Sequence, residues 1–149
     1  MCIRDSSSAV HVSTTAIEKI AVVETWTALE YAKGEFEVAQ RKRSQKTLVQ
    51  LIDKTIVPAL EADRARIEAL HGVPREQRAL LADTRDYFEL RERSWRRRRA
   101  GIAASNATIL REAAETERKA LDVFDRIQRT LGTRQTAVVD LTARKASEG

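Results

Sequence analysis

The sequence predicts an all-α protein, an antiparallel up-down bundle of four long helices in a single domain. Composition is the first reason: Ala, Leu, Glu, Arg and Lys dominate the 149 residues, and proline occurs only twice. The second is that apolar residues recur every three or four positions along four segments, the pattern of one side of a helix. The third is that the segments are joined by short connections, which favour antiparallel neighbours.

The first helix is predicted over residues 14–40, with Ser13 as its N-cap. One side of this helix holds Ile17, Ile20, Val23, Tyr31 and Val38. The other side holds a heptad-spaced strip of Val22, Leu29 and Phe36, flanked by Trp26. A helix that is apolar on two sides is either central or carries an additional interface. We expect Trp26, Leu29 and Phe36 to be left free for a partner or for the tail of the chain.

The second helix is predicted over residues 45–70, after the basic run Arg41, Lys42 and Arg43 and the capping residue Ser44. Its apolar stripe consists of Leu48, Val49, Ile52, Ile56, Leu60, Ile67 and Leu70. Pro58 lies inside this stretch and has no N–H to donate, so we expect a kink there or a break before it at Val57.

The third helix is predicted over residues 74–100, because Gly72 is a suitable C-cap for the preceding helix and Pro74 suits a first helical position. Its apolar positions are Leu80, Leu81, Phe88, Trp95 and Ile102. Residues 101–106 have two interpretations. They form a short turn in which Asn106 caps the next helix, or the helix continues through them.

The fourth helix is predicted over residues 107–131, with Gly132 as its C-cap. Its apolar positions are Ile109, Leu110, Ala113, Ala120, Leu121, Phe124, Ile127 and Leu131. Residues 133–149 are expected to form one more short helix or to fray. The bundle domain is therefore predicted over residues 13–132.

The first six residues, MCIRDS, resemble something other than protein: the translation of a transposase mosaic end used in sequencing libraries. We interpret residues 1–12 as an adapter-derived, disordered lead in an assembled fragment. On this interpretation Cys2, the only cysteine, is not native, and the chain has no thiol chemistry. On the same interpretation Met1 is not the natural start, and we expect that any upstream sequence, whether a membrane span or a catalytic domain, is absent from this fragment.

Charge and hydropathy narrow the class of protein. The formal net charge is +5, from 27 basic and 22 acidic residues. No uncharged apolar run approaches the roughly 20 residues that a membrane-spanning helix needs. We expect a soluble chain, in the cytoplasm or on the soluble side of a membrane protein, whose partner is a protein or a second copy of itself.

Each apolar stripe is interrupted near its middle by one charged residue; these are Glu24, Asp63, Arg91 and Glu117. An antiparallel register estimated from the turns places Arg91 beside Glu117 and Glu24 opposite Asp63. Because a buried charge must be paired, we predict a polar layer in which Arg91 pairs with Glu117 and stacks on Trp95. Such a layer fixes the helix register, binds an anion or small polar ligand, or lies open to solvent in a groove.

The most basic run of the chain consists of Arg96, Arg97, Arg98 and Arg99. The antiparallel bundle is expected to place this run at the same end as Arg41, Lys42 and Arg43. Two interpretations are open. The run is a solvated helix end whose charge suits the helix dipole, or it is a patch for nucleic acid, anionic lipid or an acidic partner.

Motifs for catalysis or for a bound cofactor are missing from the sequence. It has no glycine-rich phosphate loop and no Gly-x-Ser-x-Gly element. A di-iron bundle needs two Glu-x-x-His motifs, and only Glu68 with His71 matches. We therefore predict no catalytic residues, no metal and no cofactor, so that the protein is not an enzyme.

One spacing resembles a helical segment of bacterial membrane proteins, including some rhomboid-type intramembrane proteases. It reads Ile56-x-Pro58, Leu70, Val73-Pro74 and Tyr87-x-x-x-Arg91-x-x-Ser94-Trp95, within residues 26–100. The rhomboid catalytic core is not present here, so the resemblance implies an appended soluble domain. The leading hypothesis is accordingly a non-enzymatic accessory or interaction module; the others are an anion-binding module and a four-helix sensor domain.

Overall fold

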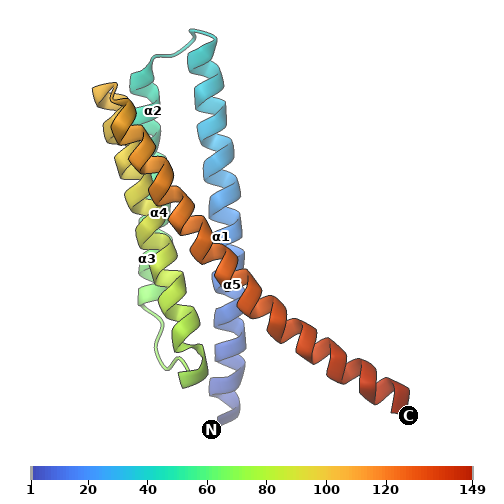
Figure 1. Ribbon diagram of the computed structural model, residues 1–149. Helices are drawn as coiled ribbons and strands as arrows, with labels where there is room; N and C mark the ends of the chain where they lie inside the picture. Colours follow the sequence, from blue (N-terminus) through green and yellow to red (C-terminus); the bar gives the residue numbers. More distant parts are fainter. Residues whose placement is uncertain (1, 149) are drawn as a thin grey trace.

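The computed structural model is a bundle of helices whose direction alternates along the chain (Figure 1). Helical backbone is described from residue 2 to residue 148, and side chains are described for residues 17–132. The helices are α1 (Cys2–Ala39), α2 (Gln45–Leu51), α3 (Val57–Glu68), α4 (Arg78–Ala104) and α5 (Ala107–Glu148). Since a π-helical turn joins α2 to α3, the chain forms four long rods. The predicted all-α antiparallel bundle is confirmed.

The two outer helix ends differ from the predicted ones. The helix α1 begins at Cys2 rather than at Thr14, so Ser13 is not its N-cap. The helix α5 does not end at Gly132 but runs on to Glu148. A glycine inside a helix costs only about 1 kcal/mol, and no proline follows Gly132 to stop the helix. The predicted lead (1–12) and the predicted tail (133–149) lie outside the residues whose side chains are described.

Pro58 is accommodated without breaking the second rod. The segment Ile52–Ile56, just before it, forms a π-helical turn, and α3 begins at Val57 with the proline in its first turn. An α-helix would crowd the proline ring against the carbonyl of Lys54, and the wider turn relieves this conflict. The predicted kink or break is thus replaced by a local change of helix type.

The third rod begins later than predicted. Pro74 has extended backbone angles, φ −58° and ψ 151°, so it lies before the helix. A 3₁₀ turn, Arg75–Gln77, follows it, and α4 begins at Arg78. Gly72 has φ +66°, the left-handed conformation that reverses the chain after α3.

The helix α4 runs past its predicted end at residue 100 to Ala104, so the predicted turn is confined to Ser105 and Asn106 and the helix does not continue through them. Ser105 takes the left-handed conformation at φ 49°, and the Asn106 side chain caps α5. Its Oδ1 accepts hydrogen bonds from the backbone N–H groups of Thr108 at 3.0 Å and Ile109 at 3.2 Å. Gly101 faces Leu110 so closely that a Cβ there would lie 2.8 Å from a Leu110 methyl group.

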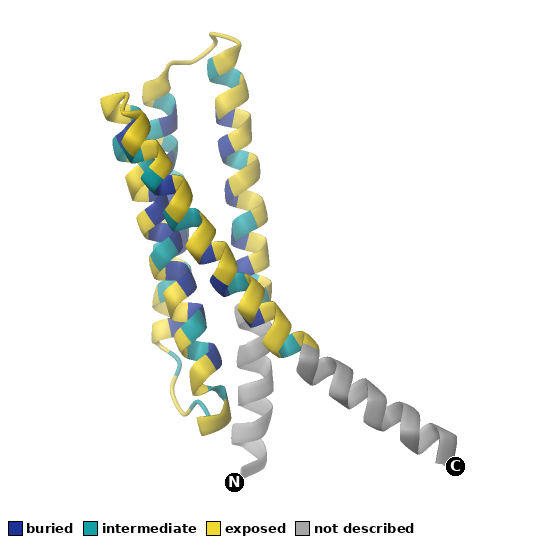
Figure 2. Cartoon of the chain, viewed as in Figure 1, coloured by how far each residue is buried: buried dark blue, intermediate teal, exposed yellow. Residues whose placement is uncertain are grey.

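The core lies between the inner faces of the rods, with α4 at its centre (Figure 2). Its larger buried side chains are Ile20, Tyr31, Leu48, Ile52, Ile56, Leu60, Ile67, Leu80, Tyr87, Phe88, Trp95 and Ile127. The small residues Ala113 and Ala120 are also buried and allow α5 to approach α4. Most of these positions belong to the predicted stripes, so helical periodicity identified the core.

Candidate functional site

A buried arginine in the middle of α4 connects three helices. The Arg91 side chain is only 4% exposed. Its Nε donates to Glu24 Oε1 of α1 at 2.6 Å, and its Nη2 lies 3.2 Å from Glu117 Oε1 of α5. Its Nη1 donates to Ser94 Oγ at 3.1 Å. The predicted ion pair between Arg91 and Glu117 is therefore present, and Glu24 is a second carboxylate partner.

Tyr87 completes the polar layer from one helical turn away. Its hydroxyl donates a hydrogen bond to Glu24 Oε1, the oxygen that also binds Arg91. Burial raises the pKa of the Tyr87 phenol, and the adjacent Glu24 carboxylate raises it further. The phenol consequently stays protonated and serves as a fixed donor.

An aromatic stack continues the layer along α4. The guanidinium carbon of Arg91 lies 4.9 Å from the centre of the Trp95 ring, as predicted. Arg98 lies over Trp95 at 5.3 Å and over Tyr31 of α1 at 5.2 Å, and its Nη2 donates to Glu117 Oε2 at 2.7 Å. Burial raises the pKa of the Tyr31 phenol, and Arg98 partly opposes this shift.

The layer is balanced in charge. Two arginines, Arg91 and Arg98, face two carboxylates, Glu24 and Glu117. All three nitrogens of the Arg91 guanidinium contact oxygen atoms of the chain itself. This arrangement aligns α1, α4 and α5 at one level, which is the register role of a buried polar group.

Asp63 does not belong to the layer, which corrects the prediction that it faces Glu24. Its Oδ1 lies 3.9 Å from Lys19 Nζ and 3.3 Å from Arg66 Nη1. Asp63 therefore faces α1 five positions before Glu24. The predicted register placed the turn immediately before the second helix. The observed connection spans residues 40–44, so its centre lies earlier in the chain, and Asp63 therefore faces an earlier part of α1.

The run from Arg96 to Arg99 is compensated by carboxylates of other helices. The Nη2 atoms of Arg96 and Arg97 lie 2.5 Å from Glu61 and 2.7 Å from Glu112, respectively. Arg98 pairs with Glu117 at 2.7 Å, and Arg99 pairs with Asp53 at 3.0 Å. The Arg96 guanidinium also lies 3.1 Å from Glu92, a buried carboxylate that Arg64 contacts at 2.7 Å.

The second basic segment does lie at the expected end of the bundle. The connection over residues 40–44 and the turn between α4 and α5 are both at the upper end in Figure 1. Within this connection Arg43 pairs with Glu37 at 3.1 Å. Arg41 and Lys42 are exposed. The basic residues thus share one end of the bundle, but most of the arginines are already held in ion pairs.

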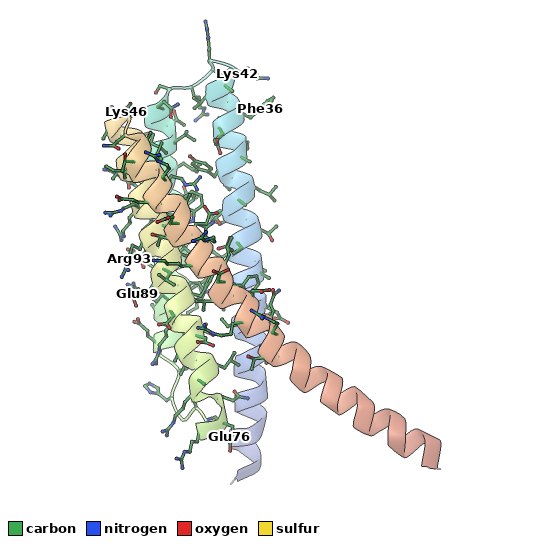
Figure 3. All side chains as sticks on the ribbon, viewed as in Figure 1. Phe36, Lys42, Lys46, Glu76, Glu89 and Arg93 are labelled. Atoms are coloured by element: carbon green, nitrogen blue, oxygen red, sulfur yellow. The ribbon has the colours of Figure 1, made fainter. Side chains whose placement is uncertain are left out.

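The outer side of α1 carries large apolar side chains in solvent. Val22 is 67% exposed, Trp26 39%, Leu29 64% and Phe36 61%. We call these four residues the α1 strip. Phe36 points away from the other helices in Figure 3. The opposite side of α1 faces the core through Ile20 and Val23, so the two predicted sides have different environments.

A groove of about 460 Å³ opens beside the polar layer, at the end where α1 turns into α2. Its lining combines Tyr31, Glu35 and Arg98 with apolar side chains of several helices. Arg91 does not line this groove. The groove therefore reaches the edge of the layer and not its centre.

The described part of the chain offers no metal centre and no membrane span. Over residues 17–132, no three His, Cys, Asp or Glu side chains are grouped so that they could hold a metal ion. No helix in that part is both long and apolar enough to cross a membrane.

Sequence reasoning missed Tyr87, Ser94 and Arg98 as members of the layer. The signal was available, because these residues lie at positions −4, +3 and +7 from Arg91 and share its side of α4. Tyr87 and Ser94 entered the prediction only through the family resemblance.

Comparisons with protein-family models, with curated proteins and with solved structures find no match to this chain. The resemblance to a rhomboid-associated segment stays a prediction.

Proposed function

We propose that this chain is a non-enzymatic helical interaction module that binds a protein through the α1 strip. The observation that carries the proposal is the exposure of Val22, Trp26, Leu29 and Phe36 on one side of one helix. Scattered apolar residues are normal on a protein surface, whereas a continuous row of large ones is typical of an interface.

The rest of the fold supports this function by presenting α1 in a defined position. The Glu24–Arg91 ion pair and the buried Ile20 hold the inner side of the helix, so its outer side faces solvent. A helix with a preformed apolar face loses little conformational entropy when a partner binds it.

Two other functions receive less support. Anion binding needs free cations, but Arg96 to Arg99 are each paired with a carboxylate of another helix. Sensing at the polar layer needs a free recognition group, but the Arg91 guanidinium is already engaged at every nitrogen.

The test is site-specific photo-crosslinking in bacterial cells that produce the chain. The photoreactive analogue p-benzoylphenylalanine replaces Phe36 in one variant and Gln50, an exposed residue of α2, in the matched control. We expect a discrete covalent protein adduct from position 36 and none from position 50. The absence of any adduct at position 36, or equal labelling from both positions, would contradict the proposal.

A further inference from the structure

We infer that the partner of the α1 strip is a second copy of this chain, paired antiparallel through α1 about a two-fold axis at Leu29. This inference rests on the proposed function and names its partner. Three properties of the strip support it: its area, the order of its side chains by size, and the placement of charges along α1.

The area of the α1 strip approaches what a symmetric dimer needs. If a large side chain presents about 200 Å² when fully exposed, the four exposed fractions leave roughly 450 Å² on each copy. Two strips in contact would bury roughly 900 Å², close to the value of about 1,000 Å² that a specific interface exceeds. The exposed residues Thr25, Ala28 and Ala32 lie beside the strip and add to it.

The order of side chains is self-complementary in the antiparallel sense. With Leu29 on the two-fold axis, Leu29 meets its own copy, and Val22 meets Phe36 of the second copy. Trp26 then lies level with Ala32 of the second copy, a small exposed residue that leaves room for the indole. Because large side chains meet smaller ones, the two helices can approach closely without voids.

The charges of α1 favour the same arrangement. In the antiparallel pairing Lys33 lies level with Thr25 and Glu30 lies level with Ala28, so no charged residue is level with a charged one. In a parallel pairing in register each charge would lie beside its own copy, and Lys33 would repel Lys33. Antiparallel pairing avoids this repulsion along the whole described part of α1.

The first experiment is sedimentation equilibrium of the full chain from about 1 μM to about 1 mM, the affinity range expected of a small interface. We expect a monomer–dimer equilibrium. Leu29→Glu places a charge on the two-fold axis and should raise the dissociation constant at least about 30-fold, as for a central contact. Leu121→Glu, at an exposed leucine of α5, is the matched control and should leave the dissociation constant unchanged. Helical circular dichroism verifies that both variants fold.

The second experiment tests orientation by disulfide formation in a Cys2→Ser background, which removes the only other thiol. Val22→Cys and Phe36→Cys chains should cross-link when mixed and oxidised. Neither should cross-link with itself, because the pairing holds like positions about 21 Å apart along the helix, 14 residues at about 1.5 Å each.

Three results would overturn the inference: a monomer at every concentration, a dimer that Leu29→Glu does not weaken, or self-cross-linking of Val22→Cys. These results are distinguishable from failure of the proposed function. A monomeric chain that still yields a position-36 adduct with another protein has a heterologous partner, whereas a chain without any adduct has no partner at the strip.

Discussion

The α4–α5 hairpin and the helix α1 are held in the bundle in different ways. The hairpin closes through a short turn, in which Ser105 has left-handed backbone angles and Asn106 caps α5. Its two helices approach each other closely at the small residues Gly101, Ala113 and Ala120. The helix α1 precedes a longer connection, residues 40–44, and contacts the hairpin through Glu24 and a few buried apolar residues.

The same bundle thus holds apolar residues that pack inside it and apolar residues that lie in solvent. The hairpin buries most of its apolar and small residues, although Leu110 and Leu121 of α5 are 38% and 39% exposed. The helix α1 divides its apolar residues between an inner side, which contributes to folding, and the α1 strip, which is exposed. The polar layer is where the two parts meet, so the largest effects are expected there.

Arg91→Ala should lower the free energy of unfolding more than any other change. It removes the contact between the hairpin and α1, and it leaves Glu24 and Glu117 without their shared cation. Breaking a buried ion pair typically costs about 3–5 kcal/mol. Urea denaturation measures the loss. Arg93→Ala is the control, since Arg93 forms only an exposed pair with Glu89, and it should change stability by less than about 0.5 kcal/mol. If both variants lost the same amount of stability, the polar layer would not be what holds α1 to the hairpin.

The two sides of α1 should differ in how much they contribute to the free energy of unfolding, which Ile20→Ala and Leu29→Ala compare. Ile20 is fully buried, so its truncation should lower the free energy of unfolding by about 2–5 kcal/mol. Leu29 lies in the exposed strip, and its truncation should change that energy by less than about 0.5 kcal/mol at concentrations where the chain is monomeric. Thermal unfolding at low protein concentration measures both. A large effect of Leu29→Ala would show that the strip packs within the monomer.

Alkaline pH should weaken the contact between α1 and α4 through the two tyrosines. Burial raises the pKa of Tyr31 and Tyr87 above the ordinary value of 10.0, so the folded chain keeps phenol protons that the unfolded chain loses. Stability is therefore complete below pH 10 and falls as the pH rises above it, by up to about 1.4 kcal/mol per pH unit for each phenol. Urea denaturation at several alkaline pH values measures this slope.

Tyr87→Phe is the control for this slope and should reduce it. The near-ultraviolet absorbance of tyrosinate, followed in the folded chain, gives an independent readout. Ionisation of both tyrosines with a midpoint near 10 in the folded state would contradict the burial argument.

Asn106→Ala should have the smallest effect and acts on the hairpin alone. It removes the side-chain oxygen that accepts hydrogen bonds from Thr108 and Ile109, a loss of about 1 kcal/mol. Asn106→Asp retains an acceptor and should preserve stability in the same denaturation assay. If both variants were equally stable, the turn would depend on packing around Gly101 and not on the cap.

The sequence by itself determined the fold class, the four rods and the two apolar sides of α1. Helical periodicity and capping residues act over a few positions, so they can be read along the chain without knowing its contacts. The pairing of Arg91 with Glu117 could also be predicted, because the turn between α4 and α5 is short and leaves little freedom of register.

Only the tertiary structure decided which charges meet across the longer connection. Residues 40–44 allow several registers, and the observed one brings Glu24 to Arg91 and sends Asp63 to Lys19. It also decided that Arg96 to Arg99 pair with acids, since their partners come from other helices. The physical reason is that a charge interacts over a few ångströms in space, and sequence spacing determines that distance only within one helix or across a short turn.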